Sequence, residues 1–396
     1  MKVIQINTTC GKGSTGKIAV SIANCAKKAG ISSIIVYGLG NTSEDKTYRV
    51  QSHKMYVLNN LLSRVFSCEG STNYFSTKKL IKFIDREQPD IIHLHNIHGH
   101  YIHSGVLFKY IKKKNIKVIW TLHDCWAFTG QCPYFTLLKC DKWKNGCGEC
   151  KQFKNYPKYL WDNTKKMWTK KRKWFTGVRE MIIVTPSNWL SDLVKQSFLS
   201  EYPIKVINNG INLDVFKPKV SNFRKNNNIK KYMILGVSFS WGIRKGLDVF
   251  IELSKVLPNN YSIVLVGTDE DIDRNLPKSI FSIHKTQNQE ELAEIYSAAD
   301  VFLMPTREDN YPTVNMEAIA CGTPVLTFKT GGSPEMVDRE TGVVILTEEI
   351  NFIANKVVEI CEKKLLLSEN CVRKASKFDQ NDRFQEYIDL YKEMIK

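Results

Sequence analysis

The chain has 396 residues, enough for roughly two or three domains, and its 43% hydrophobic and 24% charged residues exclude an intrinsically disordered protein. Its 57 lysines and arginines exceed its 40 aspartates and glutamates by 17, which favours anionic partners such as nucleic acid, an acidic membrane surface or phosphorylated ligands. No apolar run has the length of a membrane span or a signal peptide, and the 11 cysteines fit a reduced thiol pool, so we expect a cytoplasmic protein.

The first half of the chain alternates short β-branched runs with stretches of helical periodicity such as 17–28 and 78–87. This alternation is typical of parallel sheets with helices on both faces. The predicted strands are Val3–Ile6, Ile34–Val36, Ile91–Leu94, Val118–Trp120, Met181–Val184 and Lys205–Ile207.

The pattern then starts again, after a polar stretch rich in Asn and Lys at 217–231 that we predict to be a linker. The second series of strands is Met233–Val237, Ser262–Val266, Val301–Met304 and Pro324–Leu326.

We therefore predict an α/β protein of two doubly wound, Rossmann-like domains. The first covers 1–216 and the second 232–377, and they are expected to face each other across a cleft, with ligands at the carboxyl ends of the strands. The last segment, 378–396, is predicted to be an amphipathic helix that packs back on the first domain. Its apolar face is Phe384, Tyr387, Ile388, Tyr391 and Ile395.

A glycine-rich loop follows the first strand. Residues 11–17 nearly match the phosphate loop G-x-x-x-x-G-K-[ST], but Ile18 stands where that loop has a Mg²⁺-binding hydroxyl. One interpretation is a tight turn that needs glycine. The interpretation we favour is a substrate-binding loop, with backbone N–H groups around Gly13 and Gly16 pointing at a negative charge. A P-loop-like NTP-binding protein is an alternative, against which Ile18 counts.

Two carboxylates stand close together in the second half of the chain. Asp309 lies in a loop after a strand that ends at Pro305, and Glu317 lies on the helix that follows. The pair suits a polyhydroxylated ligand, because carboxylates accept hydrogen bonds from neighbouring hydroxyls. An acidic loop with an unrelated surface glutamate would give the same spacing.

The whole stretch 304–325 closely resembles the donor-site signature of glycosyltransferase family 4, retaining enzymes of the GT-B fold. In that family two acidic residues, separated by seven others, precede an A-x-A-C-G-x-P-V segment, and Asp309 and Glu317 occupy those places, the first with Asp where most members have Glu. The resemblance implies that Asp309 contacts the donor sugar and Glu317 the ribose of the nucleotide. It further implies that loop amides at Asn310 and Tyr311 hold the transferred sugar.

Two further segments resemble the same family. Gly331 and Gly332 match its Gly-Gly turn, whose backbone approaches the diphosphate, and Lys245 matches the lysine of its R…K-G segment. The usual arginine position is Ser240, for which Arg244 is the nearest substitute. The resemblance implies that Lys245 and Arg244 neutralise the departing nucleoside diphosphate without a metal. A solvated helix start is the alternative for these two cations.

In the first domain, His123 follows a predicted strand and matches the family's active-site histidine, which faces the donor sugar. Asn208–Asn212 resembles the family's N-G-[IV]-D segment, with Asn212 in place of Asp. A further group of histidines crowds one strand end and the loop after it, and we interpret this loop as acceptor-binding. The group is His93, His95, His98, His100 and His103, of which the first two should share a face of the strand.

A cysteine cluster follows His123, with the spacing C-x7-C-x6-C-x2-C. Four thiolates of this kind could close a structural zinc knuckle that takes no part in the chemistry. Thiols without a metal, or disulfides, are the alternatives. The cysteines are Cys132, Cys140, Cys147 and Cys150.

Residues 151–175 are strongly basic and contain Trp161, Trp168 and Trp174. They predict a helix on an anionic bilayer surface, a nucleic-acid-binding segment, or a solvated cationic face with its aromatics in the core. We favour the bilayer, because a transferase with a lipid-linked acceptor has to reach the membrane.

The resemblance therefore implies a retaining glycosyltransferase that needs no cofactor for catalysis. It would move a sugar from a UDP- or GDP-sugar to a glycan acceptor, by family habit lipid-diphosphate-linked, in bacterial surface polysaccharide (O-antigen, capsule or exopolysaccharide) assembly. The enzyme is expected in the cytoplasm, peripheral at the inner face of the membrane, with no nucleic acid partner. A P-loop-like NTP-binding protein and a basic nucleic-acid-binding protein remain the alternatives.

Overall fold

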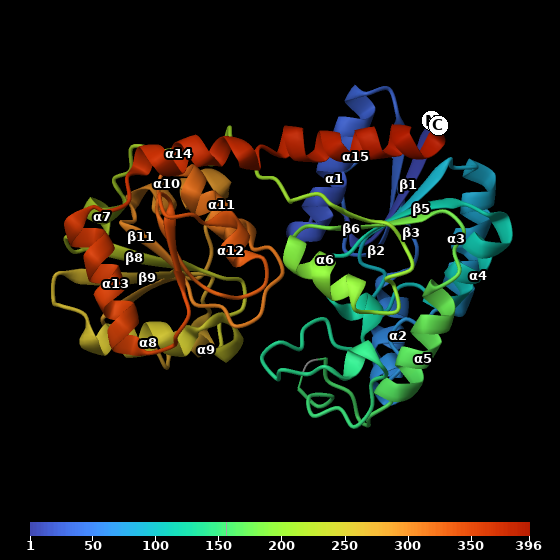
Figure 1. The fold of residues 1–396 in the computed structure, drawn as a ribbon, viewed down its shortest axis with the longest axis horizontal. Coiled ribbons are helices and arrows are strands. Elements are labelled where there is room, and N and C mark those ends of the chain that lie inside the picture. The colour runs from blue at the N-terminus through green and yellow to red at the C-terminus, as the bar shows by residue number, and fades with distance from the viewer. Residues whose placement is uncertain (156) are drawn as a thin grey trace. The chain divides into compact units, whose positions relative to one another are not determined.

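The computed structural model describes residues 1–155 and 157–396. The chain forms two compact units, one of residues 1–208 with 383–396 and one of residues 209–382. Each unit has one parallel sheet covered by helices (Figure 1). The predicted α/β class with two parallel-sheet domains is therefore confirmed.

The sheet of the first unit has seven parallel strands in the order β3-β2-β1-β4-β5-β6-β7. Neighbouring residues of one strand face opposite sides of it, so Ile91 and Ile92 lie in different hydrophobic clusters. The strands are β1 (Lys2–Thr9), β2 (Ser32–Leu39), β3 (Thr47–Arg49), β4 (Ile91–Leu94), β5 (Lys117–Thr121), β6 (Met181–Thr185) and β7 (Ile204–Val206).

The strand order reverses between β1 and β4, and the carboxyl ends of strands at such a reversal are where ligands bind in doubly wound folds. The helices of this unit are α1 (Gly13–Lys28), α2 (His53–Val65), α3 (Tyr74–Glu87), α4 (Ser104–Lys114), α5 (Thr164–Phe175) and α6 (Asn188–Lys195), with short 3₁₀ turns η1 (Trp126–Phe128) and η2 (Lys142–Lys144).

The last helix, α15 (Gln380–Ile395), crosses α1 and packs against it (Figure 1). Its buried side chains pack against Ile18 and Ile22 of α1, whereas Ile395 at its end is exposed. The hydroxyl of Tyr391 is 2.7 Å from Nδ1 of His93 in β4. Residues from Arg383 onward thus complete the core of the first unit. The buried side chains are Phe384, Tyr387, Ile388, Leu390 and Tyr391.

The second unit has six parallel strands in the order β10-β9-β8-β11-β12-β13. Its strands are β8 (Tyr232–Val237), β9 (Tyr261–Val266), β10 (Ile280–Ile283), β11 (Val301–Met304), β12 (Val325–Phe328) and β13 (Gly342–Ile345). Its helices are α7 (Phe223–Asn226), α8 (Leu247–Val256), α9 (Glu270–Asp273), α10 (Gln289–Ala298), α11 (Thr313–Ala320), α12 (Ser333–Met336), α13 (Ile350–Lys363) and α14 (Ser368–Ala375), with 3₁₀ turns η3 (Ile243–Lys245) and η4 (Ser376–Phe378).

The stretch expected as a linker, 217–231, lies within this second unit and contains α7. Arg224 holds it there, because its guanidinium donates to the carbonyl of Ala298 (2.6 Å) and pairs with Asp300. The change of unit falls between Asn208 and Asn209. Hydrogen bonds therefore anchor this polar stretch together with the apolar side chains of Phe223 and Ile229, which pack against the core of the unit.

The structure of the basic stretch 151–175 does not fit the expected helix on a bilayer surface. Trp168 on α5 is buried and donates to the carbonyl of Trp143 (2.8 Å), and Trp174 packs against His103. Lys171 is 0% exposed. The tryptophans of α5 therefore pack inward and do not face a bilayer, which leaves Trp161, ahead of the helix, as the exposed one.

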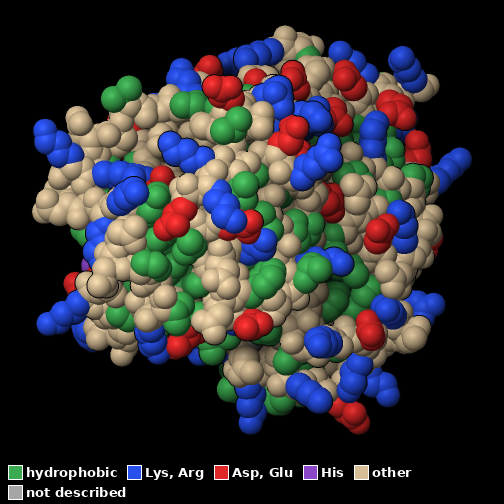
Figure 2. Space-filling view, turned by 60° about the vertical axis from the view of Figure 1, so that its left-hand side comes forward, with side chains coloured by type: hydrophobic (Ala, Val, Ile, Leu, Met, Phe, Trp, Pro, Cys, Tyr) green, Lys and Arg blue, Asp and Glu red, His purple; other side chains and the backbone are tan. Residues whose placement is uncertain are grey.

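Among the described residues, no helix is long and apolar enough to cross a membrane. On the face shown in Figure 2, lysine and arginine side chains are spread over the surface with acidic side chains among them. The positive charge is thus dispersed on that face.

Candidate active site

Two loops of the second unit are bonded to each other where strands β8 and β11 end. The backbone N–H of Arg307 donates to the carbonyl of Arg244 (2.9 Å), and the hydroxyl of Thr306 donates to the same carbonyl (3.2 Å). Because β8 and β11 are neighbours in the sheet, their carboxyl ends meet at one edge. The segments carrying Lys245 and Asp309 therefore come together.

Lys245 and Asp309 are in direct contact. The ammonium nitrogen of Lys245 is 2.5 Å from Oδ2 of Asp309, and the two side chains are 16% and 19% exposed. Oδ1 of Asp309 accepts the backbone N–H of Asn310 (2.9 Å). A cation and a carboxylate expected to serve the same ligand thus share one partly buried position.

Arg307, which the sequence analysis did not single out, fixes the acidic loop. Its guanidinium donates two hydrogen bonds to Asp248 (2.9 and 2.7 Å) and others to Glu348. Hydrogen bonding to Asp248, opposed by burial, raises the pKa of Arg307, and the same bonds lower the pKa of Asp248. This bidentate pairing is the geometry in which arginine holds a carboxylate most firmly.

The turn after β12 closes against the same loop. Gly331 has φ of +54°, and a Cβ on it would lie 2.0 Å from the carbonyl oxygen of Asp309. The N–H of Gly332 donates to the carbonyl of Asn310 (2.6 Å). Only glycine fits at position 331, so the predicted Gly-Gly turn and the predicted acidic loop form one backbone surface.

Glu317 lies on α11, directly after this loop. Its Oε2 accepts the hydroxyl of Tyr296 from α10 (3.1 Å), and burial raises the pKa of Tyr296 well above its usual range, so that hydroxyl remains a donor. Tyr311 is buried in the core cluster beside α11. The structure therefore orients Glu317 through Tyr296 and uses the Tyr311 side chain for packing.

In the first unit, His123 follows β5 and stacks on His95. Nδ1 of His95 lies 3.1 Å from Nε2 of His123, and Nε2 of His95 lies 3.0 Å from Oε1 of Gln5. Since the amide of Gln5 donates to Ala19 and Ser33, its Oε1 is an acceptor, and His95 must donate to it from Nε2. His95 then accepts at Nδ1, so His123 carries its proton on Nε2.

Burial controls the charge of both histidines. It lowers the pKa of His123 to about 4 and that of His95 well below its usual range. Both rings are therefore neutral at pH 7. The predicted histidine is a neutral ring of fixed tautomer at the carboxyl end of a central strand.

Two family matches cover nearly all of the chain. Residues 16–215 match the model of Glycosyltransferase Family 4, and residues 219–378 match the model of Glycosyl transferases group 1. The chain belongs to glycosyltransferase family 4. The colanic acid biosynthesis glycosyl transferase WcaC of Escherichia coli K12 is similar to this glycosyltransferase, with 23% identity over 100% of both chains.

Two other proteins are similar. The N,N'-diacetylbacillosaminyl-diphospho-undecaprenol alpha-1,3-N-acetylgalactosaminyltransferase of Campylobacter jejuni is 28% identical over 56% of this chain and 62% of its own. The solved structure of Anabaena Alr3699/HepE with UDP-glucose has a TM-score of 0.68 and 14% identity, over 99% of this chain and 100% of the other. Such neighbours place this glycosyltransferase in the predicted GT-B fold class.

The glycine-rich loop of the glycosyltransferase closes on itself. The N–H of Gly11 donates to the carbonyl of Gly16 (3.2 Å), and α1 begins at Gly13. Ile18 is 5% exposed and belongs to the core beneath α15. The place of a Mg²⁺-binding hydroxyl is therefore filled by a core side chain, which counts further against the NTP-binding alternative.

The histidine-rich loop of the glycosyltransferase is tied down internally. His93 and His95 share a face as predicted, with ring centroids 4.1 Å apart, but both are buried, so neither can contact an acceptor directly. The acceptor-binding interpretation is wrong for these two. The remaining three are partnered: His98 with Asp124 (2.9 Å), His100 with Ser63 (2.7 Å) and His103 with the N–H of Val106 (3.3 Å).

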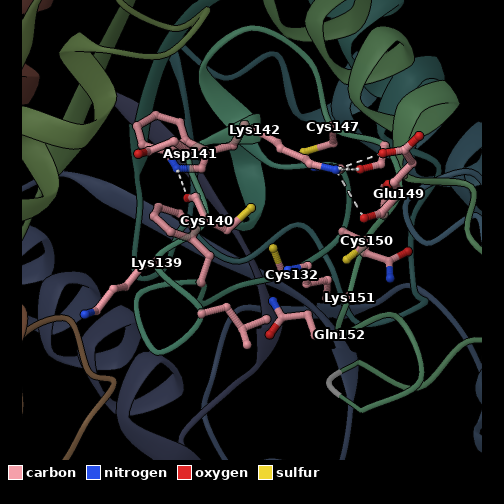
Figure 3. A pocket seen from close by; sticks show the side chains of 17 residues that line it. Cys132, Lys139, Cys140, Asp141, Lys142, Cys147, Glu149, Cys150, Lys151 and Gln152 are labelled. Atoms are coloured by element: carbon pink, nitrogen blue, oxygen red, sulfur yellow. Dashed lines mark hydrogen bonds and ion pairs between the residues drawn. The ribbon is translucent and has the colours of Figure 1, made fainter.

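The four cysteines of the predicted zinc site all line one pocket of the first unit (Figure 3). As they stand, no three His, Cys, Asp or Glu side chains among the described residues are arranged to hold a metal ion.

The predicted site residues fall in separate units. Gly13, Gly16 and His123 lie in the first unit, and Lys245, Asp309 and Glu317 lie in the second.

Proposed function

We propose that this glycosyltransferase moves a sugar from a UDP- or GDP-sugar to a lipid-diphosphate-linked glycan, with retention of configuration, during assembly of a bacterial surface polysaccharide. Two relatives support the pathway and the acceptor, since one is named for colanic acid and the other for a diphospho-undecaprenol acceptor. The solved neighbour that holds UDP-glucose supports the class of donor.

The observation that carries the proposal is the contact of Lys245 with Asp309 beside the Gly331–Gly332 turn. A diphosphate lying against the glycine backbone would be within reach of the Lys245 ammonium. Arg244, the preceding residue, would supply a second cation. These cations would stabilise the charge that develops on the departing nucleoside diphosphate, so the chemistry needs no metal.

The remaining residues bind the donor. Asp309 accepts hydrogen bonds from hydroxyls of the transferred sugar, amides at Asn310 and Tyr311 hold that sugar, and Glu317, oriented by Tyr296, accepts from the ribose. An acceptor hydroxyl attacks the anomeric carbon on the face from which the diphosphate leaves. The bond to the diphosphate oxygen breaks as the new glycosidic bond forms, and the hydroxyl proton passes to the departing oxygen.

In the first unit, neutral His123 would hydrogen-bond the donor sugar. Gln5 and His95 act through it as positioning residues, because they set its tautomer. Backbone N–H groups at Gly13 and Gly16 would bind negative charge on the acceptor.

We place the glycosyltransferase at the inner surface of the membrane through α2, not α5. The buried residues of α2 are the polar Asn59 and Ser63, whereas its apolar side chains face solvent. Trp161 continues this apolar surface, since its Nε1 donates to the carbonyl of Val65 (2.8 Å). The exposed side chains are Val57, Leu58, Leu61, Leu62, Val65, Phe66, Leu160 and Trp161.

A helix with its apolar side chains facing solvent suits the interface of an anionic bilayer. Cosedimentation with phosphatidylglycerol vesicles should fall for Leu58→Glu/Leu61→Glu. The matched change Leu365→Glu/Leu367→Glu, at equally exposed leucines of the second unit, should leave it unchanged. Equal binding by both variants would rule out α2 as the docking surface.

Thermal unfolding with UDP, GDP, ADP and Mg-ATP, each with and without EDTA, tests the donor site. A ligand at about 100 times its Kd adds roughly 2.7 kcal/mol to stability. A shift with UDP or GDP that survives EDTA is expected and names the base. A shift with Mg-ATP alone would overturn the proposal.

A further inference from the structure

A long irregular segment follows His123 in the first unit. Between η1 and α5, within residues 129–155 and 157–163, the single element is the 3₁₀ turn η2. Segments of this length without regular structure are uncommon in a compact domain, and small irregular lobes are usually held by a cross-link or a metal. This segment therefore needs a source of order besides backbone ladders.

The pocket within this segment is lined by four cysteines. It has a volume of about 240 Å³, and Figure 3 shows the sulfur atoms of the four on its wall. Every one of the four is a free thiol in this structure. Cys147 and Cys150 come from one turn, and Cys132 and Cys140 come from irregular stretches on either side of Phe135.

The turn between Cys147 and Cys150 has a conformation that few residues adopt. Gly148 has φ of +154° and Glu149 has φ of +47°. This backbone brings both ends of the C-x-x-C sequence to the pocket. The thiol spacing favoured by tetrahedral metal sites is thus built into the turn.

Hydrogen-bond donors already point at these sulfur atoms. The N–H of Gly130 lies 3.1 Å from Sγ of Cys147, the N–H groups of Gln152 and Phe153 donate to Cys150, and the side chain of Gln152 donates to Cys132. A thiol is a weak acceptor, whereas a thiolate is a strong one. These donors would therefore suit metal-bound thiolates, whereas without a metal burial raises the pKa of Cys132, Cys147 and Cys150 and keeps them as thiols.

A second observation points to a ligand of this pocket. Gln131 lines the same pocket, is 3% exposed, and has no hydrogen-bond partner for either its amide nitrogen or its amide oxygen. A buried amide without partners is costly and calls for an unseen water, ion or charged group. A thiolate in the pocket would accept from its nitrogen.

The charges around the pocket are complementary to an anionic site. The buried side chain of Lys171 lies close enough to Cys132 and Cys147 to interact with them. Lys139, Lys142 and Lys151 line the pocket and outnumber its two acidic residues, Asp141 and Glu149. A divalent ion with four thiolates carries a net charge of about −2. These cations would offset it.

We propose that Cys132, Cys140, Cys147 and Cys150 bind one Zn²⁺ as a tetrahedral tetrathiolate site that holds the segment between η1 and α5 in place. Four Zn–S bonds form, and the four thiol protons leave to solvent. The thiols close in around the ion to about 2.3 Å. The site is structural and independent of the transfer reaction.

The test is the zinc content of the full-length protein purified without added metal or chelator. About one zinc per chain is expected, falling below about a tenth in Cys147→Ser/Cys150→Ser. The matched control Cys25→Ser/Cys68→Ser removes two half-buried thiols of the same unit outside the pocket and should keep the zinc. Wild type without zinc, or a double variant that retains it, would overturn the proposal.

Two measurements on the wild type stand even where the double variant does not fold. Exchange of the metal for Co²⁺ should give the strong visible absorption of a tetrahedral thiolate site, and a chelator should lower the thermal midpoint. Absence of the cobalt bands overturns the proposal. So does alkylation under denaturing, non-reducing conditions that leaves these four cysteines unmodified, because they would then be disulfides.

Discussion

The ammonium of Lys245 lies 2.5 Å from Oδ2 of Asp309, and each residue is also tied to the loop of the other through the carbonyl of Arg244 and the N–H of Arg307. The cation is therefore held in its place before a donor binds. Preorganised charge of this kind accelerates a reaction more than charge that must be recruited during it.

Replacing Lys245 should reduce turnover strongly. We expect Lys245→Met to lower kcat by about 10²–10³, as the loss of one preorganised charge-stabilising group does. Lys255→Met is the matched control, because that exposed lysine pairs with Glu252 on the same helix. Steady-state transfer kinetics for both variants provide the measurement, and a Lys245→Met rate within threefold of wild type would contradict the assignment.

Gly331→Ala should damage the site more than the fold. The new Cβ would lie 2.0 Å from the carbonyl oxygen of Asp309, so the acidic loop has to move. Gly30→Ala is the control, since Gly30 has a similar φ of +73° but open space around it, and it should cost only about 1 kcal/mol of stability. Donor KM and urea unfolding should separate the two variants: equal donor KM values would mean that the turn does not shape the site.

Stability should fall as the pH drops below about 6.5, in part because of His93. Burial, with a smaller contribution from His123, lowers the pKa of His93 to about 3. Above pH 6.5 neither the folded nor the unfolded chain protonates this residue, whereas below it only the unfolded chain does. At pH 5 the difference is about 2 kcal/mol.

His93→Gln, which keeps a hydrogen-bonding side chain but does not titrate, should remove about 2 kcal/mol of the loss between pH 7.5 and pH 5. Tyr391→Phe removes the hydrogen bond to His93 and should cost about 1 kcal/mol at both pH values. Urea unfolding at the two pH values decides, and an unchanged pH dependence in His93→Gln would argue against a buried neutral ring.

Ile18→Thr restores the hydroxyl of a phosphate loop, yet it should only destabilise. Ile18 packs under α15, so a buried hydroxyl there should cost about 2 kcal/mol, with no gain of Mg-ATP hydrolysis. Thermal unfolding and phosphate release check the two parts. Protection by Mg-ATP in the variant would reopen the NTP-binding alternative.

Central strands were predictable because both of their faces are buried. The predicted runs Ile91–Leu94 and Val301–Met304 coincide with β4 and β11. The strands not predicted from the sequence, β3, β10 and β13, are all at sheet edges, where one neighbour suffices and mixed sequences such as Thr47–Arg49 are tolerated. Periodicity alone does not distinguish such strands from loops.

The site was predictable where the chain itself keeps residues together, as in the loop from Asp309 to Glu317. Contacts between distant residues were not. Asp248 is 59 residues from Arg307, and His95 is 90 from Gln5, so no local pattern announces either pair. The burial of Lys171 was not predictable from the basic sequence of α5, because the carbonyls of Trp126 and Thr129 that accept its ammonium lie more than 40 residues away in the chain.

The position of helix α15 has a consequence for folding during synthesis. Its tyrosines pack over His93 and α1 of the first unit, although Tyr391 and His93 are nearly 300 residues apart in the sequence. During synthesis, the sheet from β1 to β7 emerges first, and one of its apolar faces stays uncovered until the second unit has been made. A nascent chain stalled before Arg383 should therefore expose that face to chaperones. The last residues to be synthesised complete the domain that was synthesised first.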